Sequence, residues 1–187
     1  MTRQALLRPC LLTLAVMTPF ASPHAAEPTD ARQAAECAVW ARELSFADTV
    51  ARQDLEGFAE HVHPQGVFSA SERPEGRLVG RDAILQGWGP IVGGHHMTIR
   101  WYPTSTVASP DGTVVWSSGP ALVISRSRSI GGVPPTYSIG AFHSVWARDD
   151  DGVWRVIFDD GVEPVLATPE QVADFEGERP AACPSGA

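Results

Sequence analysis

The chain has 187 residues, of which 43% are hydrophobic, and a formal net charge of −8. This length fits one domain whose core is large enough to be stable without disulfide bonds or bound metal ions. The acidic balance argues against nucleic acid and anionic membrane surfaces as partners.

Residues 1–26 have the three parts of a secretory signal peptide. Arg3 and Arg8 give a basic start, the run from Leu11 to Met17 is apolar, and small residues lead up to Ala26. The apolar run is too short to span a bilayer as a helix, and no later segment is long and apolar enough to do so. We therefore predict cleavage near Ala26 and a periplasmic or secreted mature protein.

Two cysteines remain after this cleavage, Cys37 near the start of the mature chain and Cys183 near its end. In an oxidising compartment an even pair of cysteines favours a disulfide, which here would tie the C-terminal tail to the first helix. The alternative is a buried free Cys37 and an unpaired Cys183. If the bond forms, we expect its role to be structural.

The first part of the mature chain is predicted to be helical. Apolar residues recur at helical spacing over residues 30–53, and Asp54 is typical of the cap of a second, short helix that Pro64 ends. A short strand follows at 66–70, and a third helix begins at Gly80. The apolar positions assigned to the first helix are Cys37, Trp40, Ala41, Leu44, Ala47 and Ala51.

After the third helix the apolar period changes to two, which is typical of strands. The connections between these strands are hairpin-like, so we expect an antiparallel sheet. The helices should cover one face of this sheet. The fold class is therefore α+β, with a single domain over 30–166 and a partly helical tail over 167–187. The strands are predicted at residues 95–107, 113–125, 136–148 and 153–163.

Three local segments, in this order, resemble the nuclear transport factor 2-like superfamily, which includes ketosteroid isomerases and SnoaL-type cyclases. They are Asp54-Leu55-Glu56-Gly57-Phe58, Gly80-Arg81-Asp82-Ala83-Ile84, and the last hairpin with Val145-Trp146-Ala147-Arg148, Asp151-Gly152-Val153-Trp154-Arg155 and Asp159. The resemblance covers about residues 35–163. It implies a cone-shaped fold with a pocket between the curved sheet and the helices, and a homodimer formed through the exposed face of the sheet.

The isomerase mechanism itself does not carry over to this chain. Ketosteroid isomerases place a catalytic Tyr late in the first helix and a general-base Asp at the end of the first strand, and those places fall on Phe46 and Ala70. A phenyl ring has no hydroxyl to donate and a methyl group cannot accept a proton.

His143 and Asp159 form the best acid-base pair that the sequence offers. Both lie on predicted strands next to each other, and strand side chains line the pockets of the superfamily. Structural alternatives exist for both residues: His143 as a satisfied core residue, and Asp159 or Asp160 as the cap of the turn at Gly161 or the partner of an Arg such as Arg100.

Five further residues are candidates for ligand contacts: His63, Phe68, Trp101, Tyr137 and Arg126. His63 lies close to the expected pocket rim, although a His there can also complement the end of a helix. Trp101 is placed at the mouth of the pocket. Arg126 belongs to a long hairpin loop, 126–135, which could hold an acidic ligand or simply remain solvated.

No motif in the chain indicates a cofactor. It has no Gly-x-Ser-x-Gly, no phosphate loop and no dinucleotide fingerprint, and the neighbours His95 and His96 would point to opposite faces of a strand. We therefore expect no cofactor and no metal. Three functions stay open: a binding protein for a small apolar or acidic molecule, which we favour, a cofactor-free lyase, isomerase or hydrolase, and a protein-interaction module.

Overall fold

The computed structural model describes residues 28–69, 76–125, 134–180 and 182–184. The predicted signal peptide lies outside these residues. The helices are α1 (Pro28–Ala51), α2 (Leu55–His61), α3 (Arg81–Val92) and α4 (Pro169–Gly177). The strands are β1 (Val62–Ser69), β2 (Arg77–Val79), β3 (Met97–Trp101), β4 (Ser105–Ala108), β5 (Val114–Ser125), β6 (Thr136–Arg148) and β7 (Trp154–Leu166). The predicted α+β class and the order of its main elements are confirmed.

The seven strands form one curved sheet in the order β2-β1-β7-β6-β5-β3, with β4 also pairing with β5. All neighbours are antiparallel except β1 and β7, which run parallel. The expectation of a wholly antiparallel sheet was wrong at this one place, because hairpins fix the direction only of consecutive strands. The last strand, β7, therefore lies in the middle of the sheet.

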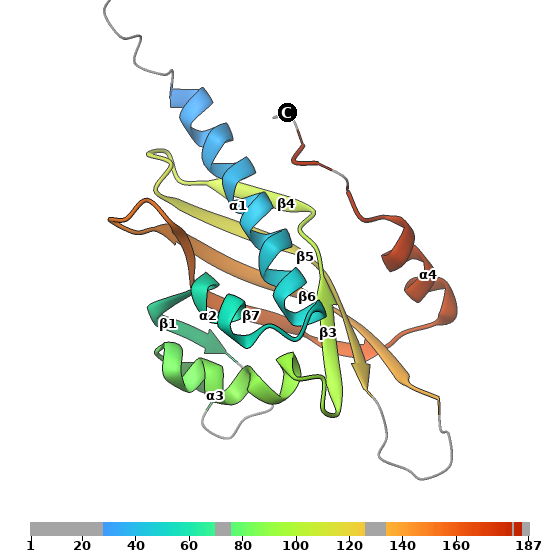
Figure 1. The fold of residues 1–187 in the computed structure, drawn as a ribbon. Coiled ribbons are helices and arrows are strands. Elements are labelled where there is room, and N and C mark those ends of the chain that lie inside the picture. Colours follow the sequence, from blue (N-terminus) through green and yellow to red (C-terminus); the bar gives the residue numbers. More distant parts are fainter. Residues whose placement is uncertain (1–27, 70–75, 126–133, 181, 185–187) are drawn as a thin grey trace, which may run out of the picture.

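One face of the sheet is covered by α1, α2 and α3, and part of the opposite face by α4 (Figure 1). Successive residues of a strand alternate between the two faces. In β5, Ala121 and Val123 face the cavity described below, whereas Leu122 packs with Phe175 of α4 and with Tyr102. We call the face toward α1 to α3 the inner face and the other one the outer face.

Helix α1 buries one continuous stripe against the inner face of the sheet. This stripe consists of Ala35, Val39, Glu43, Phe46 and Val50, each at most 7% exposed. The predicted apolar face was right for Trp40 and Ala47, which are buried, but it included the exposed Ala41 and Ala51 and left out Val39 and Phe46. The reason is Glu43, whose charge interrupts the apolar pattern in the sequence although the residue lies in the core.

Helix α2 has the predicted N-cap, because the Asp54 carboxylate accepts a hydrogen bond of 2.8 Å from the Gly57 amide. His61 ends the helix, donates through Nδ1 to the Gly57 carbonyl at 2.7 Å and accepts through Nε2 from the Ser45 hydroxyl. Burial lowers the pKa of His61 to about 4. This histidine is therefore a neutral structural residue near neutral pH.

The strand predicted over 95–107 is divided into β3 and β4, which pair with the two halves of β5. The chain bends between them, where Gly119 of β5 lies directly below. A Cβ atom at Gly119 would lie 2.1 Å from the carbonyl oxygen of Tyr102, so only glycine allows this approach. The bend directs Trp101 to the inner face and Tyr102 to the outer face, where it contacts Phe175 of α4.

The predicted disulfide between Cys37 and Cys183 is present, with an S–S distance of 2.10 Å. It fastens the segment after α4 to α1, so the C-terminal part of the chain reaches from the outer face of the sheet back to the helix layer (Figure 1). Arg100 of β3 pairs with Glu176 of α4 and lies over the ring of Phe175. In the part of the chain that the structure describes, no helix combines the length and the apolar character needed to cross a membrane.

Candidate functional site

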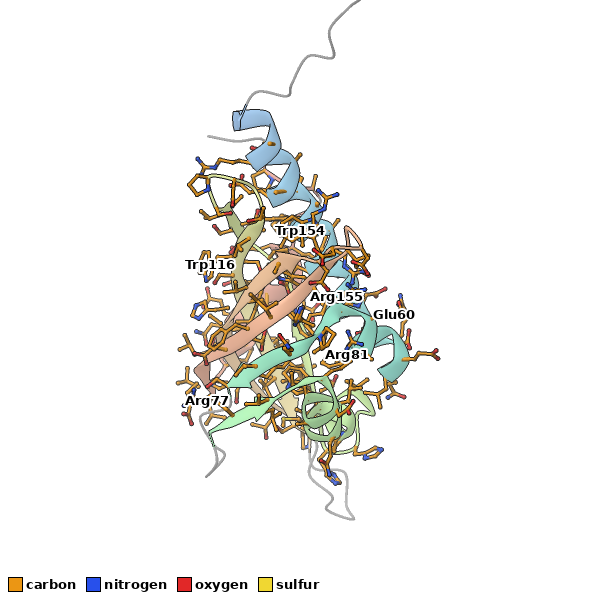
Figure 2. All side chains as sticks on the ribbon, turned by 90° about the vertical axis from the view of Figure 1, so that its left-hand side faces the viewer. Glu60, Arg77, Arg81, Trp116, Trp154 and Arg155 are labelled. Atoms are coloured by element: carbon orange, nitrogen blue, oxygen red, sulfur yellow. A yellow bond between two sulfur atoms is a disulfide. The ribbon has the colours of Figure 1, made fainter. Side chains whose placement is uncertain are left out.

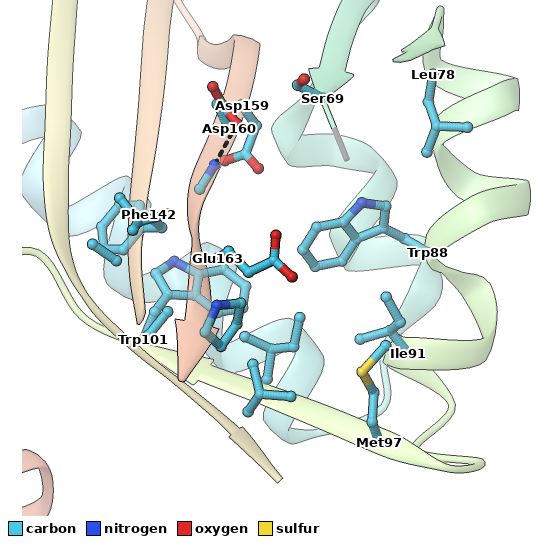
Figure 3. A pocket seen from close by; sticks show the side chains of 17 residues that line it. Ser69, Leu78, Trp88, Ile91, Met97, Trp101, Phe142, Asp159, Asp160 and Glu163 are labelled. Atoms are coloured by element: carbon cyan, nitrogen blue, oxygen red, sulfur yellow. Dashed lines mark hydrogen bonds between the residues drawn. The ribbon is translucent and has the colours of Figure 1, made fainter. Parts of the chain in front are cut away.

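A cavity of about 410 Å³ opens between the inner face of the sheet and α3. Most of its wall is apolar, and its polar side chains are Ser69 of β1 and three acidic residues of β7 (Figure 3). Within the ranges that the structure describes, no Lys, Arg or His lines this cavity. The lining consists of Ser69, Leu78, Trp88, Ile91, Met97, Ile99, Trp101, Ala121, Val123, Ala141, Phe142, Asp159, Asp160, Gly161, Val162, Glu163 and Pro164.

Aromatic rings from three elements form much of this wall. The rings of Trp88 and Trp101 meet edge to face with centroids 6.4 Å apart, and Trp101 and Phe142 are separated by the same distance. Trp101 is only 6% exposed and its indole N–H is bonded to a carboxylate in the core, so its position is fixed from behind. The wall is therefore a preformed surface for apolar or planar groups.

Asp159 is the acidic residue that lies deepest in the cavity wall. Its Oδ2 accepts a hydrogen bond of 2.8 Å from the Ser144 hydroxyl on the neighbouring strand β6. Burial raises the pKa of Asp159 well above that of an ordinary aspartate, and the carboxyls of Glu43 and Asp160 act in the same direction, against the hydrogen bond from Ser144. A carboxyl group whose pKa is raised in this way is a stronger base than an ordinary aspartate and is a candidate for proton transfer.

Behind the aromatic wall lies Glu43 of α1, which is fully buried. Its Oε1 accepts a hydrogen bond from the indole of Trp101 at 2.7 Å, and its Oε2 accepts from the Ser117 hydroxyl at 2.6 Å and from the indole of Trp146 at 2.8 Å. Burial raises the pKa of Glu43, and the hydrogen bonds oppose that shift. One carboxyl group thus joins α1 to β3, β5 and β6.

The structure does not bring His143 and Asp159 together. His143 is paired in register with Asp160, and its ring stacks on Trp116 with centroids 5.9 Å apart. Trp116 lies on the outer face, 39% exposed, on the side of the sheet away from α1 and α2 (Figure 2). The Asp159 carboxylate points to the inner face, where it accepts from Ser144, its partner in the register. The acid-base pair is therefore split between the two faces.

The predicted ligand contacts are also divided. Trp101 lines the cavity, whereas Phe68 is fully buried behind it, edge to face with Trp88. Tyr137 packs on the outer face with the cluster around Phe175. His63 lies 3.3 Å from the carboxylate of Asp149, away from the cavity. Arg126 and Ala70 lie outside the described residues.

Phe46, at the place of the isomerases' tyrosine, is a core residue that contacts Phe58, Trp101 and Trp146. Of the two structural alternatives for the acidic pair, the turn cap was wrong, because Gly161 lies within β7 and pairs with Phe142. The Asp160 Oδ1 does accept a hydrogen bond from the Gly161 amide, at 2.7 Å. Arg100 pairs with Glu176 instead. In the ranges that the structure describes, no three His, Cys, Asp or Glu side chains gather in a way that could hold a metal ion.

A family model described as the SnoaL-like domain matches residues 44–157. The chain belongs to this SnoaL-like domain family. The match runs from the last third of α1 to the first residues of β7, so it spans most of the elements that surround the cavity. The comparison with curated proteins found no match.

Solved structures with the same fold include a nuclear transport factor 2-like superfamily protein from Salmonella enterica, 15% identical with a TM-score of 0.57, covering 73% of this chain and 95% of that one. A ketosteroid isomerase-like protein from Erwinia carotovora is 13% identical with a TM-score of 0.56, covering 71% and 98%. A candidate scytalone dehydratase from Novosphingobium aromaticivorans is 15% identical with a TM-score of 0.60, covering 75% and 92%. At these identities the likeness shows the cone fold of this SnoaL-like domain and not its activity.

Glu43, Ser144 and Trp88 are the site residues that the sequence interpretation missed. A signal for Glu43 does exist, because it lies at helical spacing between Val39 and Phe46. Ser144 could have been placed beside Asp159 only with the strand register, which the sequence does not give. The homodimer and the export of this SnoaL-like domain stay predictions.

Proposed function

We propose that the protein binds a small, mainly apolar molecule in the cavity between α3 and the inner face of the sheet. The observation that supports this most is the preformed aromatic wall of Trp88, Trp101 and Phe142 around an open volume of about 410 Å³. This volume is within the range of ordinary small-molecule sites, which are mostly apolar with a few polar groups. Asp159 is the polar group that would orient the ligand.

An acidic ligand receives no support from the residues that line the cavity. Asp159, Asp160 and Glu163 are all acidic, and no basic side chain among the described residues lines the cavity. The formal net charge of −8 would also repel an anion over longer distances. Between the two ligand types that the sequence left open, the apolar one is therefore the proposal.

Two fluorescent probes that share one ring skeleton test both parts of the proposal. N-phenyl-1-naphthylamine is neutral, and 8-anilinonaphthalene-1-sulfonate carries an added sulfonate. We expect the neutral probe to bind with energy transfer from Trp88 and Trp101, and the anionic probe to bind at least about tenfold more weakly, a difference of about 1.4 kcal/mol. The measurement is a fluorescence titration of the chain without residues 1–26.

A matched pair of valine substitutions locates the binding. Val123→Trp fills the cavity from β5, whereas Val145→Trp adds the same bulk on the outer face of β6, and both valines are half-buried. Binding of the neutral probe should be lost in the first variant and kept in the second. Equal binding by both variants, or none by the parent protein, would argue for a protein-interaction module instead.

A second candidate function, acid-base catalysis by Asp159 alone, is favoured by the raised pKa of this carboxyl group at the cavity wall. The chemistry within reach of a single carboxyl group is proton transfer next to a carbonyl, as in a dehydratase or an isomerase. The solved structures named above include one described as a candidate dehydratase and one described as isomerase-like. Here His143 has no role.

For this second function we expect the protein to catalyse proton–deuteron exchange in cyclic β-hydroxyketones, at the carbon next to the carbonyl group. The exchange rate is measured by NMR in D₂O. Asp159→Asn should slow the exchange by about 100-fold or more, because general acid-base catalysis contributes factors of that size. Asp160→Asn is the matched control and should retain most of the rate. Exchange that survives Asp159→Asn would show that Asp159 is not the base.

A further inference from the structure

The carboxyl groups of Glu43 and Asp159 are joined by one side chain, the hydroxyl of Ser144. This hydroxyl donates to Asp159 Oδ2 at 2.8 Å, and Ser144 is paired across the sheet with Ser117, whose hydroxyl donates to Glu43 Oε2 at 2.6 Å. A hydrogen bond from Ser144 also acts against the rise of the Glu43 pKa. Ser144 is fully buried and has a single proton to donate. It can therefore serve only one of the two carboxylates at a time.

The other partners of Glu43 leave little freedom in this arrangement. The indoles of Trp101 and Trp146 are donors only, and each holds one of the Glu43 oxygens at 2.7 or 2.8 Å. Trp101 is at the same time a wall of the cavity. An indole nitrogen can only donate a hydrogen bond, whereas a hydroxyl can donate or accept one. Ser144 and Ser117 are therefore the neighbours whose hydrogen bonds can change when Glu43 gains or loses a proton.

We propose that Glu43 is a positioning residue of the cavity, which fixes Trp101 from behind and, through Ser144, sets the pH at which Asp159 exchanges its proton. The proposal deepens the function proposed above, since it concerns the regulation of the polar group that would meet the ligand. It does not depend on which ligand is bound. When Asp159 is ionised, Ser144 donates to it, and when Asp159 is protonated, Ser144 can donate to Glu43.

The groups that surround Asp159 allow the sign of the coupling to be worked out. From α1 comes Glu43, from β7 come Asp160 and Glu163, and His143 of β6 faces the outer side. The cavity residues that β1 and α3 contribute, Ser69, Trp88 and Ile91, carry no charge. Removing the charge of Glu43 leaves less repulsion and frees Ser144 for Asp159, and both effects favour the ionised form of Asp159.

Carboxyl-carbon NMR titration of the chain without residues 1–26, labelled at Asp and Glu carboxyls, tests the proposal without any ligand. Glu43→Gln should lower the pKa of Asp159 by about half a pH unit or more. Ser144→Ala should raise it, because Asp159 loses its donor. A merely structural effect, in which a loosened core admits water, would lower the pKa in both variants.

The control is Glu36→Gln on the same face of α1, two helical turns before Glu43. The Glu36 carboxylate accepts from the Ala108 amide at 2.9 Å and takes no part in the cavity wall, so the pKa of Asp159 should not change. If Glu43→Gln does not fold, the reciprocal measurement is made on Asp159→Asn, in which the pKa of Glu43 should fall. The coupling is overturned if the pKa of Asp159 is unchanged in Glu43→Gln, or if the pKa of Glu43 is unchanged in Asp159→Asn. Either result leaves the proposed binding function intact.

Discussion

Replacing Glu43 by alanine will lower the free energy of unfolding by about 4 kcal/mol, since a donor left without a partner in a core costs about 1 to 3 kcal/mol. The change removes the acceptor of two indole N–H groups and of the Ser117 hydroxyl, all at fully or almost fully buried residues. It also opens a void beneath Trp101. Three such donors would together cost about 3 to 9 kcal/mol. The expected loss lies near the lower end of this range, because removing the carboxyl group also removes the cost of burying it.

Urea unfolding followed by far-ultraviolet circular dichroism measures this loss. Glu36→Ala is the matched control, because Glu36 is partly exposed and accepts one hydrogen bond, from the Ala108 amide. We expect a cost of about 1 kcal/mol there. If the two variants lost equal stability, Glu43 would not hold the helix to the sheet in the way its hydrogen bonds indicate.

Removing the bond between Cys37 and Cys183 will destabilise the domain by up to about 5 kcal/mol, from the loop-closure entropy of a long loop. The bond spans a sequence separation of 146 residues. The expected loss is an upper bound, because α4 remains attached by Phe175 and by the ion pair of Arg100 with Glu176 after the bond is cut. The double substitution Cys37→Ser and Cys183→Ser avoids the use of reductant.

The measurement compares urea midpoints of the parent and the double variant, each with and without dithiothreitol, in the chain without residues 1–26. That chain has no cysteine besides these two, because Cys10 belongs to the predicted signal peptide. Reductant should shift the parent to the midpoint of the variant and leave the variant unchanged. A parent that is insensitive to reductant would contradict a stabilising role for the bond.

The fold was predicted well from local signals, because caps, periodicity and turns act over a few residues. Asp54 at the start of α2 and the turn between β6 and β7 are examples. The parallel pairing of β1 with β7 was not predictable in this way, since nothing local in either strand specifies a partner almost a whole domain away. The break of the predicted strand 95–107 depends on the close approach of Gly119, which is equally nonlocal.

The site was predicted only in part for a related reason. Asp159 and Trp101 were recognised as candidates and do line the cavity. His143 was placed beside Asp159 because both lie on the last hairpin, but the register pairs it with Asp160 and turns its ring to the outer face. In a strand, an error of one residue exchanges the faces. Glu43 was overlooked because a charged residue is usually a sign of an exposed helix face.

The central position of β7 also affects how the chain must be made. Its neighbours β1 and β6 both come earlier in the sequence, so until β7 has been synthesised each has an unpaired edge on the side that β7 will fill. A chain interrupted before β7 cannot close its sheet, lacks Asp159 and presents two open edges to other chains. We therefore expect the protein to fold only after synthesis has passed β7, and nascent or truncated chains to depend on chaperones and to be cleared by proteases.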